Sequence, residues 1–214
     1  MASIPREKIA LFVLTAVILL ITAGIAWYLI AGHSWNYAAT AIDDAAGNME
    51  DYRIILYEGT AAPSSKQVDD KGNLTFTPVS LASTAKDYEE KGATVFTLDS
   101  LNLETYREPQ VFERDGYRVG VVYAAVEDTT LQVQEKVDKL IERKVNVVIA
   151  IAQDNSRLAQ VEGIDAVIDL EAGSSLSARN DDNGFRITMP AVGSIGVIVL
   201  SPSDVLSARS LPNR

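Results

Sequence analysis

The sequence predicts an α/β protein: a mixed, mostly parallel sheet flanked by helices, preceded by one N-terminal transmembrane helix. Strand-like apolar runs alternate with amphipathic helical patterns from Tyr52 onward, as is typical of α/β folds. The run Asn146–Ala152 (NVVIAIA) is continuously apolar, as expected for a strand covered on both faces. A long uncharged stretch near the N-terminus predicts the helix in the membrane.

That stretch, Ile9–Gly32, contains no charged side chain over 24 residues. It exceeds the ~20 residues with which a helix crosses the hydrocarbon core of a bilayer. Arg6 and Lys8 precede it, so we expect the N-terminus in the cytoplasm and the remainder of the chain outside. The alternative is a cleaved signal peptide, whose apolar region normally spans only ~7–15 residues. The length therefore favours an uncleaved, single-pass anchor in the cell membrane.

The expected organisation has one folded domain outside the membrane. Residues 1–8 form a cytoplasmic N-terminus, 9–32 the transmembrane signal anchor, 33–50 a stalk or linker, 51–204 an extracytoplasmic α/β domain and 205–214 a tail. About 150 residues suffice to bury a single hydrophobic core.

The first half of the domain is expected to contain two strands and a helix. Tyr52–Tyr57 (YRIILY) is typical of a first core strand, and Glu58–Pro78 is polar and predicted as a loop. Ser80 caps a predicted helix over Leu81–Lys91. Ala93–Leu98 (ATVFTL) follows as a buried strand.

The next segment contains two local sequence signals, a hairpin turn and a helix cap, that are stronger than those in the first half of the domain. Asp115-Gly116 predicts a hairpin between the arms Gln110–Arg114 and Tyr117–Ala124. Thr129 and Gln132 match a capping box at the start of a helix. Its apolar stripe comprises Val133, Val137, Leu140 and Ile141.

The remaining predicted elements are shorter. They are a helix over Ser156–Val161, a strand over Asp165–Leu170, a loop over Arg179–Gly184, strands over Phe185–Met189 and Ser194–Leu200, and a frayed tail after Ser201.

Composition excludes several kinds of function. The chain has no cysteine, so it has neither disulfides nor a thiolate nucleophile. Its single histidine, His33, precedes the predicted domain, so a Ser-His-Asp triad within the domain is excluded. The net charge of −10 repels nucleic acid. We therefore expect no nucleic-acid partner.

Between Gln110 and Leu200, five segments follow one another in a recognisable order. They are a hairpin entering a strand (FERDGYRVGVVYA), an amphipathic helix (VQEKVDKLIERKV), a strand (VNVVIAIA), a turn with a strand (EGIDAVIDL) and a closing pair (ITMPAVGSIGVIVLSPSD). This order resembles the metallophosphoesterases, in particular the 5′-nucleotidase and UDP-sugar hydrolase family, and the capsule-synthesis relatives of that superfamily are similarly compatible. The resemblance implies a metallophosphoesterase-like α/β fold.

The metal ligands that the resemblance would imply are replaced. Gln153 stands where the family has the histidine of its "LSH" motif, and Glu171 and Gly173 replace the two histidines of "GHSH". Glu58-Gly59-Thr60 occurs in place of the Asp-x-His that follows the first strand, and the family's Asn-His-Glu segment is missing. We therefore expect no catalytic residue, no metal site and no cofactor of the family's kind.

Polar residues nevertheless follow several predicted strands, at the edge where open α/β sheets bind ligands. They form a candidate site for a polar ligand, although they also suit helix capping and loop hydrogen bonds. These candidates are Asp99, Asn102, Gln153, Asp154, Asn155 and Glu171.

Three functions remain open from the sequence. The leading expectation is a membrane-anchored, non-catalytic domain that binds a protein or cell-envelope partner. A second is a metal-dependent hydrolase with an oxygen-ligand site built from Asp99, Asp154 and Glu171. A third is a single-pass accessory subunit of a membrane complex, whose helix packs through small residues: Ala16, Ala23, Gly24 and Ala26.

Overall fold

The computed structural model describes residues 15, 20–21, 47–63, 68–69, 71–73, 75, 77–153, 158–170, 178–181, 184–203 and 205–211. The chain forms two compact units, Met1–Asn36 and Tyr37–Arg214. In the first unit, Thr15, Leu20 and Ile21 are helical. The rest of the predicted anchor lies outside the described residues. Within the described part of the chain, no helix is long and apolar enough to span a bilayer.

The second unit contains the α/β domain. Its helical elements are α3 (Leu81–Glu90), the 3₁₀ turn η1 (Leu103–Tyr106) and α4 (Thr130–Glu142). Its strands are β1 (Arg53–Glu58), β2 (Thr94–Leu98), β3 (Gln110–Arg114), β4 (Tyr117–Ala124), β5 (Val147–Ala152), β6 (Ala166–Asp169), β7 (Ala178–Asp181), β8 (Gly184–Thr188), β9 (Ile195–Leu200) and β10 (Leu206–Leu211).

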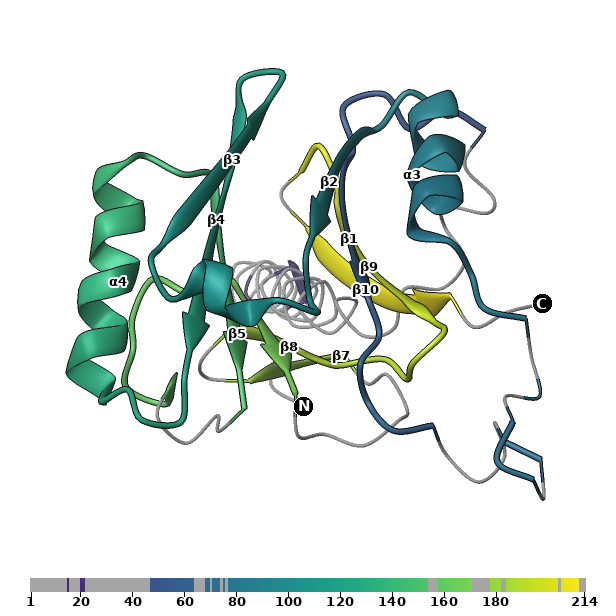
Figure 1. Ribbon diagram of the computed structural model, residues 1–214. Helices are drawn as coiled ribbons and strands as arrows, with labels where there is room; N and C mark the ends of the chain where they lie inside the picture. Colours follow the sequence, from purple (N-terminus) through teal and green to yellow (C-terminus); the bar gives the residue numbers. More distant parts are fainter. Residues whose placement is uncertain are drawn as a thin grey trace, which may run out of the picture. The chain divides into compact units, whose positions relative to one another are not determined.

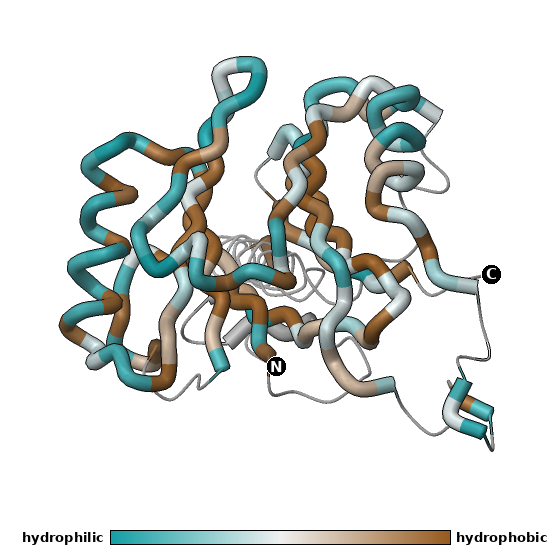
Figure 2. The backbone as a smooth tube through the Cα atoms, in the orientation of Figure 1, coloured by the Kyte–Doolittle hydropathy of each residue, from teal (hydrophilic) through white to brown (hydrophobic). Residues whose placement is uncertain are grey.

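These strands form two sheets that lie face to face between two helices. One sheet has the order β10-β9-β1-β2, and the other has the order β3-β4-β5-β6-β8-β7. Helix α3 covers the outer face of the first sheet, and α4 covers the outer face of the second (Figure 1). The domain is thus a four-layer α/β/β/α sandwich, in which apolar residues concentrate along the strands (Figure 2).

Side-chain alternation along the strands explains the four layers. In β1, Ile55 and Tyr57 face the cluster between the sheets, whereas Ile54 and Leu56 face the cluster beneath α3. A strand that is apolar on both faces therefore separates two cores. Met49, at the end of the expected stalk, is fully buried in the cluster beneath α3.

The α/β class with flanking helices is confirmed, but the expectation of one mostly parallel sheet is corrected. The described strands form eight pairings, of which four are parallel and four antiparallel. The structure differs from the prediction because β9 pairs antiparallel with β1 and so belongs to the first sheet instead of extending the second. An apolar run shows that a strand is covered on both faces, but not whether helices or a second sheet cover it.

Strong local signals match the structure closely. The hairpin arms β3 and β4 have the predicted bounds, and Asp115 and Gly116 adopt φ of 50° and 75° in the turn. The capping box of α4 is formed: the Gln132 amide donates to Thr129 Oγ1, and the Thr129 amide donates to Gln132 Oε1. Ile141 is the exception in the predicted apolar stripe of this helix, because half of its surface is exposed to solvent.

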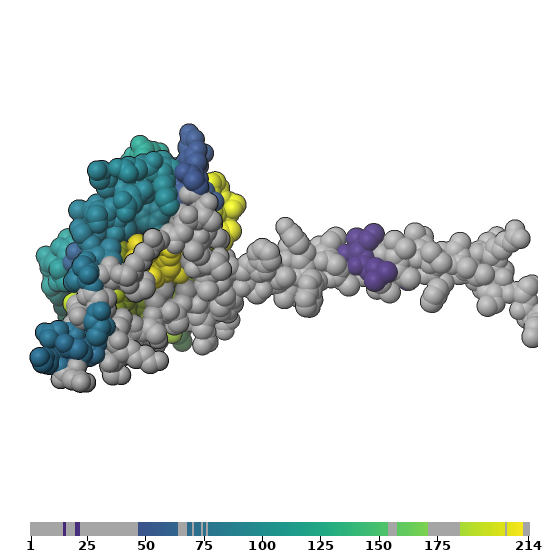
Figure 3. Space-filling view, turned by 90° about the vertical axis from the view of Figure 1, so that its right-hand side faces the viewer, coloured from purple at the N-terminus to yellow at the C-terminus, as the bar shows by residue number. Residues whose placement is uncertain are grey.

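Two strands differ from the predicted loop and tail. The segment Arg179–Gly184, expected as a loop, contains most of β7, which pairs with β8. The segment expected to fray contains β10, which pairs along the full length of β9. Both lack a strong apolar alternation, so tertiary pairing overrides their weak propensity. Residues of the C-terminal strands (yellow) and of the α3 region (teal) reach the surface in Figure 3.

Candidate functional site

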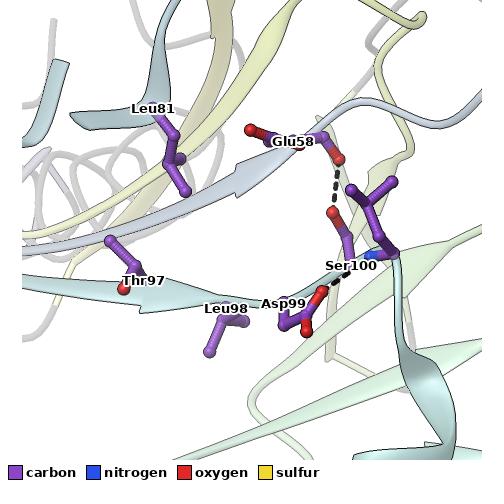
Figure 4. A pocket seen from close by; sticks show the side chains of 7 residues that line it. Glu58, Leu81, Thr97, Leu98, Asp99 and Ser100 are labelled. Atoms are coloured by element: carbon purple, nitrogen blue, oxygen red, sulfur yellow. Dashed lines mark hydrogen bonds between the residues drawn. The ribbon is translucent and has the colours of Figure 1, made fainter. Parts of the chain in front are cut away.

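A pocket of about 310 Å³ opens at the carboxyl ends of β1 and β2. Its lining combines two carboxylates, two hydroxyls and three leucines (Figure 4). The lining residues are Glu58, Leu81, Thr97, Leu98, Asp99, Ser100 and Leu101. We refer to it below as the strand-end pocket.

The β1-α3-β2 unit brings these residues together. Because β1 and β2 are parallel, their carboxyl ends meet at one edge, and the crossover helix α3 begins at the same edge with Leu81. Leu56 and Val95 face α3, so alternation directs Glu58 and Thr97 to the same side of the sheet. The Glu58 side chain accordingly extends from β1 toward Leu81 (Figure 4).

Asp99 is held in place by its own turn. Its Oδ1 accepts hydrogen bonds of 3.1 Å from the amides of Leu101 and of Asn102. Its own amide donates to the hydroxyl of Tyr106 at 2.7 Å, and burial raises the pKa of that hydroxyl. Both carboxylate and backbone of Asp99 are therefore oriented before any ligand binds. The second carboxylate oxygen, Oδ2, makes no protein hydrogen bond among the described residues.

Ser100 connects the two strand ends. Its hydroxyl donates a 2.6 Å hydrogen bond to the backbone carbonyl of Glu58, and the side chain is buried. The contact joins residues that are 42 positions apart in the chain. It fixes the position of the end of β1, at Glu58, relative to the end of β2, next to Asp99.

The chain beyond β1 is tightly packed at Gly59. A Cβ at this position would lie 2.1 Å from the carbonyl oxygen of Ala191, so only glycine fits. The Gly59 amide donates to the Ser194 carbonyl, and the Ala61 amide donates to the Pro190 carbonyl. This backbone pairing fixes the direction in which the chain leaves Glu58.

The pocket is acidic. Glu58 is half-buried and Asp99 is exposed. Among the described residues, no Lys or Arg makes a salt bridge with either carboxylate. The pocket therefore presents negative charge that its described surroundings leave uncompensated.

The residues predicted from the sequence are distributed as follows. Asp99 lines the strand-end pocket, and Asn102 is exposed in the same turn. Gln153 is exposed after β5, in the other sheet, and is not part of this pocket. Asp154, Asn155 and Glu171 lie outside the described residues.

Sequence reasoning did not select the other charged group of the pocket. Glu58 is the last residue of β1, and its position after an apolar strand was an available signal. Thr97 and Ser100 have no signal in the sequence that distinguishes them from other hydroxyl residues.

A buried carboxylate, Asp169, was also missed. It ends β6 between Ala152 and Thr188 of the neighbouring strands, with an exposed fraction of 7 %. An acidic residue within an apolar run was the only available signal.

The side chains that line the pocket are chemically suited to bind a positively charged group. Over the part of the chain that the structure describes, no three His, Asp or Glu side chains converge as a metal-ligand group. The pocket offers carboxylate and hydroxyl oxygens as hydrogen-bond acceptors, together with aliphatic carbon surface.

No family model matches the sequence, and no curated protein matches it. Several solved structures resemble the fold. A candidate 5′-nucleotidase from Staphylococcus aureus, solved with alpha-ketoglutarate, matches 75 % of this chain at 10 % identity with a TM-score of 0.48. This chain covers 54 % of that protein, so it spans about half of its length.

Two further structures resemble the fold over different shares of their length. A phosphatase from Mycoplasma pneumoniae matches 76 % of this chain and 94 % of its own, at 7 % identity and a TM-score of 0.41. The NAD nucleotidase of Haemophilus influenzae matches 48 % of this chain and 29 % of its own, at 17 % identity and a TM-score of 0.38. With such low scores, these similarities do not assign this chain to a family.

Proposed function

We propose that the protein is a membrane-anchored, extracytoplasmic and non-catalytic domain of metallophosphoesterase-like build, which acts as a binding or envelope-assembly module. One observation carries this proposal: the chain has a single histidine, His33, and it precedes the α/β domain. A dinuclear phosphoesterase centre holds its ions ~3.5–4 Å apart with several convergent ligands. The imidazoles for such a centre are missing from this domain.

The geometry of the strand ends supports a binding role. At the end of β5, where the resemblance implies a metal-binding histidine, the chain has the exposed amide Gln153. One carboxylate oxygen of Asp99 accepts hydrogen bonds from its own turn. A pocket built in this way has its acceptor groups held ready to bind a ligand.

Anchoring in the membrane rests on the sequence of Ile9–Gly32. Its length and lack of charge suit a bilayer span, and the preceding Arg6 and Lys8 favour a cytoplasmic N-terminus. Labelling of single cysteines introduced at residue 3 and in α4 with a membrane-impermeant reagent in intact cells tests this topology. We expect labelling only in α4; labelling only at residue 3 would reverse the orientation.

The non-catalytic role is tested by assaying the full-length protein in nanodiscs. Phosphomonoesters, phosphodiesters and nucleotides are incubated with Mn²⁺, Zn²⁺, Mg²⁺ or Ca²⁺, and phosphate or nucleoside release is measured. We expect no release above that of protein-free nanodiscs. Turnover that is lost in Gln153→Ala, Asp99→Asn or Glu171→Gln would show that the domain is an enzyme.

One observation favours the second function, a hydrolase with an oxygen-ligand metal site. The strand-end pocket carries two carboxylates on adjacent strands, and hard cations prefer such oxygens. Thermal unfolding with and without Mg²⁺ or Ca²⁺ distinguishes the two functions. A metal-dependent rise in the unfolding temperature that disappears in Asp99→Asn would favour the hydrolase, whereas the binding module predicts no such rise.

A further inference from the structure

We propose that the strand-end pocket binds an aliphatic chain that ends in a cationic nitrogen, such as an alkylammonium or alkylguanidinium group. The inference rests on the proposed binding function and names the chemistry of its ligand. The cavity of about 310 Å³ is at the lower end of the range for ligand pockets, about 300–1,000 Å³, and suits one extended side-chain-sized group.

The charge of the pocket selects the cationic end of the ligand. Glu58 and Asp99 carry two formal negative charges, and no described Lys or Arg neutralises them. The start of α3, at Leu81, is the opposing influence, because a helix N-terminus carries roughly half a positive charge. Two carboxylates outweigh this partial charge, so a cation is favoured over an anion.

The carbon surface of the pocket selects the aliphatic part. Leu81 and Leu101 lie beside the carboxylates, and Leu101 is exposed to 71 % although it is large and apolar. A methylene chain that covers these leucines gains about 25 cal/mol for each Å² of apolar surface removed from water. A hydrated metal ion gains nothing from these contacts.

The geometry also argues against a bare metal ion as the ligand. Ca²⁺ takes 6–8 oxygen ligands, and Mg²⁺ requires an octahedron. The pocket offers two carboxylates, and one oxygen of Asp99 already accepts from the amides of Leu101 and Asn102. An ammonium group needs only three acceptors, which Glu58, Oδ2 of Asp99 and a hydroxyl of the pocket can supply.

The test measures binding to the full-length protein in nanodiscs by NMR titration and calorimetry at neutral pH. The probes are Nα-acetyl-lysine methylamide, 1,5-diaminopentane, and Nα-acetyl-norleucine methylamide, which has the same chain without the charge. Mg²⁺ and Ca²⁺ alone form a further arm. We expect both amines to bind, with weaker binding at high salt, and the norleucine analogue and the metals not to bind.

Three variants locate the binding. Asp99→Asn keeps an oxygen for the amides of its turn, and Glu58→Gln keeps the side-chain shape. Glu135→Gln, on the exposed side of α4 at the opposite face of the sandwich, is the matched control for net charge. We expect about fivefold weaker binding for each pocket variant, tenfold or more for both together, and no change for the control.

The outcomes separate the possible ligands. Stronger binding of the lysine derivative indicates a side chain of a partner protein, and stronger binding of the diamine indicates a free polyamine. Amine binding that is equal in the pocket variants and in Glu135→Gln, or metal binding without amine binding, would overturn the proposal. Catalytic turnover with intact amine binding would instead overturn only the non-catalytic role.

Discussion

The hydroxyl of Tyr106 accepts a 2.7 Å hydrogen bond from the backbone amide of Asp99 and thereby connects η1 to the carboxyl end of β2. Tyr106 is 1 % exposed, and its ring lies 6.3 Å from that of Phe112, tilted by 59°. The packed ring holds the hydroxyl in place, so the backbone that carries the Asp99 carboxylate is fixed by a core residue.

Tyr106→Phe should lower the free energy of unfolding by ~1–2 kcal/mol, because it leaves the partly buried Asp99 amide without its acceptor. Tyr57→Phe is the matched control. The hydroxyl of Tyr57 is fully buried and has no hydrogen-bond partner among the described residues, so its removal should be neutral or stabilising. Urea unfolding of the two variants measures this contrast, and equal destabilisation would contradict it.

The same two tyrosines predict a loss of stability at alkaline pH. Burial raises the pKa of both Tyr57 and Tyr106 above that of an unfolded tyrosine, about 10. Above that pH the unfolded chain loses the phenolic protons while the folded chain keeps them, so stability present below about pH 10 declines above it. The urea midpoint should fall between about pH 9 and 11.5. Tyr57→Phe should make this decline shallower; parallel curves would refute the assignment.

Gly196 is required by the ring of Tyr57. The two residues are directly paired between β1 and β9, and a Cβ on Gly196 would lie 2.2 Å from Cζ of the ring. Gly196→Ala should therefore destabilise the domain by about 1–3 kcal/mol or more through overpacking. In a Tyr57→Leu background the same change should cost clearly less, because the ring is gone. If the effects of the two substitutions are additive in this double-mutant cycle, the clash between the new Cβ and the Tyr57 ring is relieved elsewhere in the domain.

Lys136 and Asp128 form a partly buried ion pair at the start of α4. Lys136 Nζ lies 2.7 Å from Asp128 Oδ2, with side chains 16 % and 11 % exposed, and the Ala125 amide donates to the same oxygen. Burial alone raises the pKa of Asp128, but the hydrogen bonds from Lys136 and Ala125 outweigh it and lower the pKa. The pair therefore contributes stability above the unfolded pKa of about 3.9, which is lost as the pH falls.

Lys136→Met should lower the free energy of unfolding at neutral pH by about 2 kcal/mol, between the values for exposed and buried pairs. The difference from the unchanged protein should begin to narrow below about pH 4, where the aspartate of the unfolded chain takes up its proton, and should close only below the lowered pKa of Asp128 in the folded chain. Denaturant unfolding at pH 7 and pH 3 measures both values. A difference that is as large at pH 3 as at pH 7 would mean that packing of the lysine chain, and not its charge, is responsible.

Much of the local structure could be predicted because its signals lie within a few residues. Asp115-Gly116 specifies a two-residue turn, and Thr129 with Gln132 specifies a helix start, so β3, β4 and the start of α4 follow directly. In contrast, β10 carries polar residues on a short segment, and only pairing with β9 makes it a strand. No hydropathy pattern within Leu206–Leu211 indicates that this segment pairs with β9.

The candidate site shows the same division. Asp99 could be predicted, because it follows a strand and heads a polar turn. Its association with Glu58 could not, since it depends on which strand lies beside β2 and on the bond from Ser100 to the Glu58 carbonyl.

The sequence by itself determined the class of the domain, most of its helices and strands, and the lack of imidazole ligands within it. Each of these depends on composition or on spacing along the chain. Only the tertiary structure decided that the strands divide into two facing sheets and that Glu58 and Asp99 share one pocket. The physical reason is that strand pairing and sheet stacking are non-local contacts, selected by the burial of apolar surface between segments far apart in the chain.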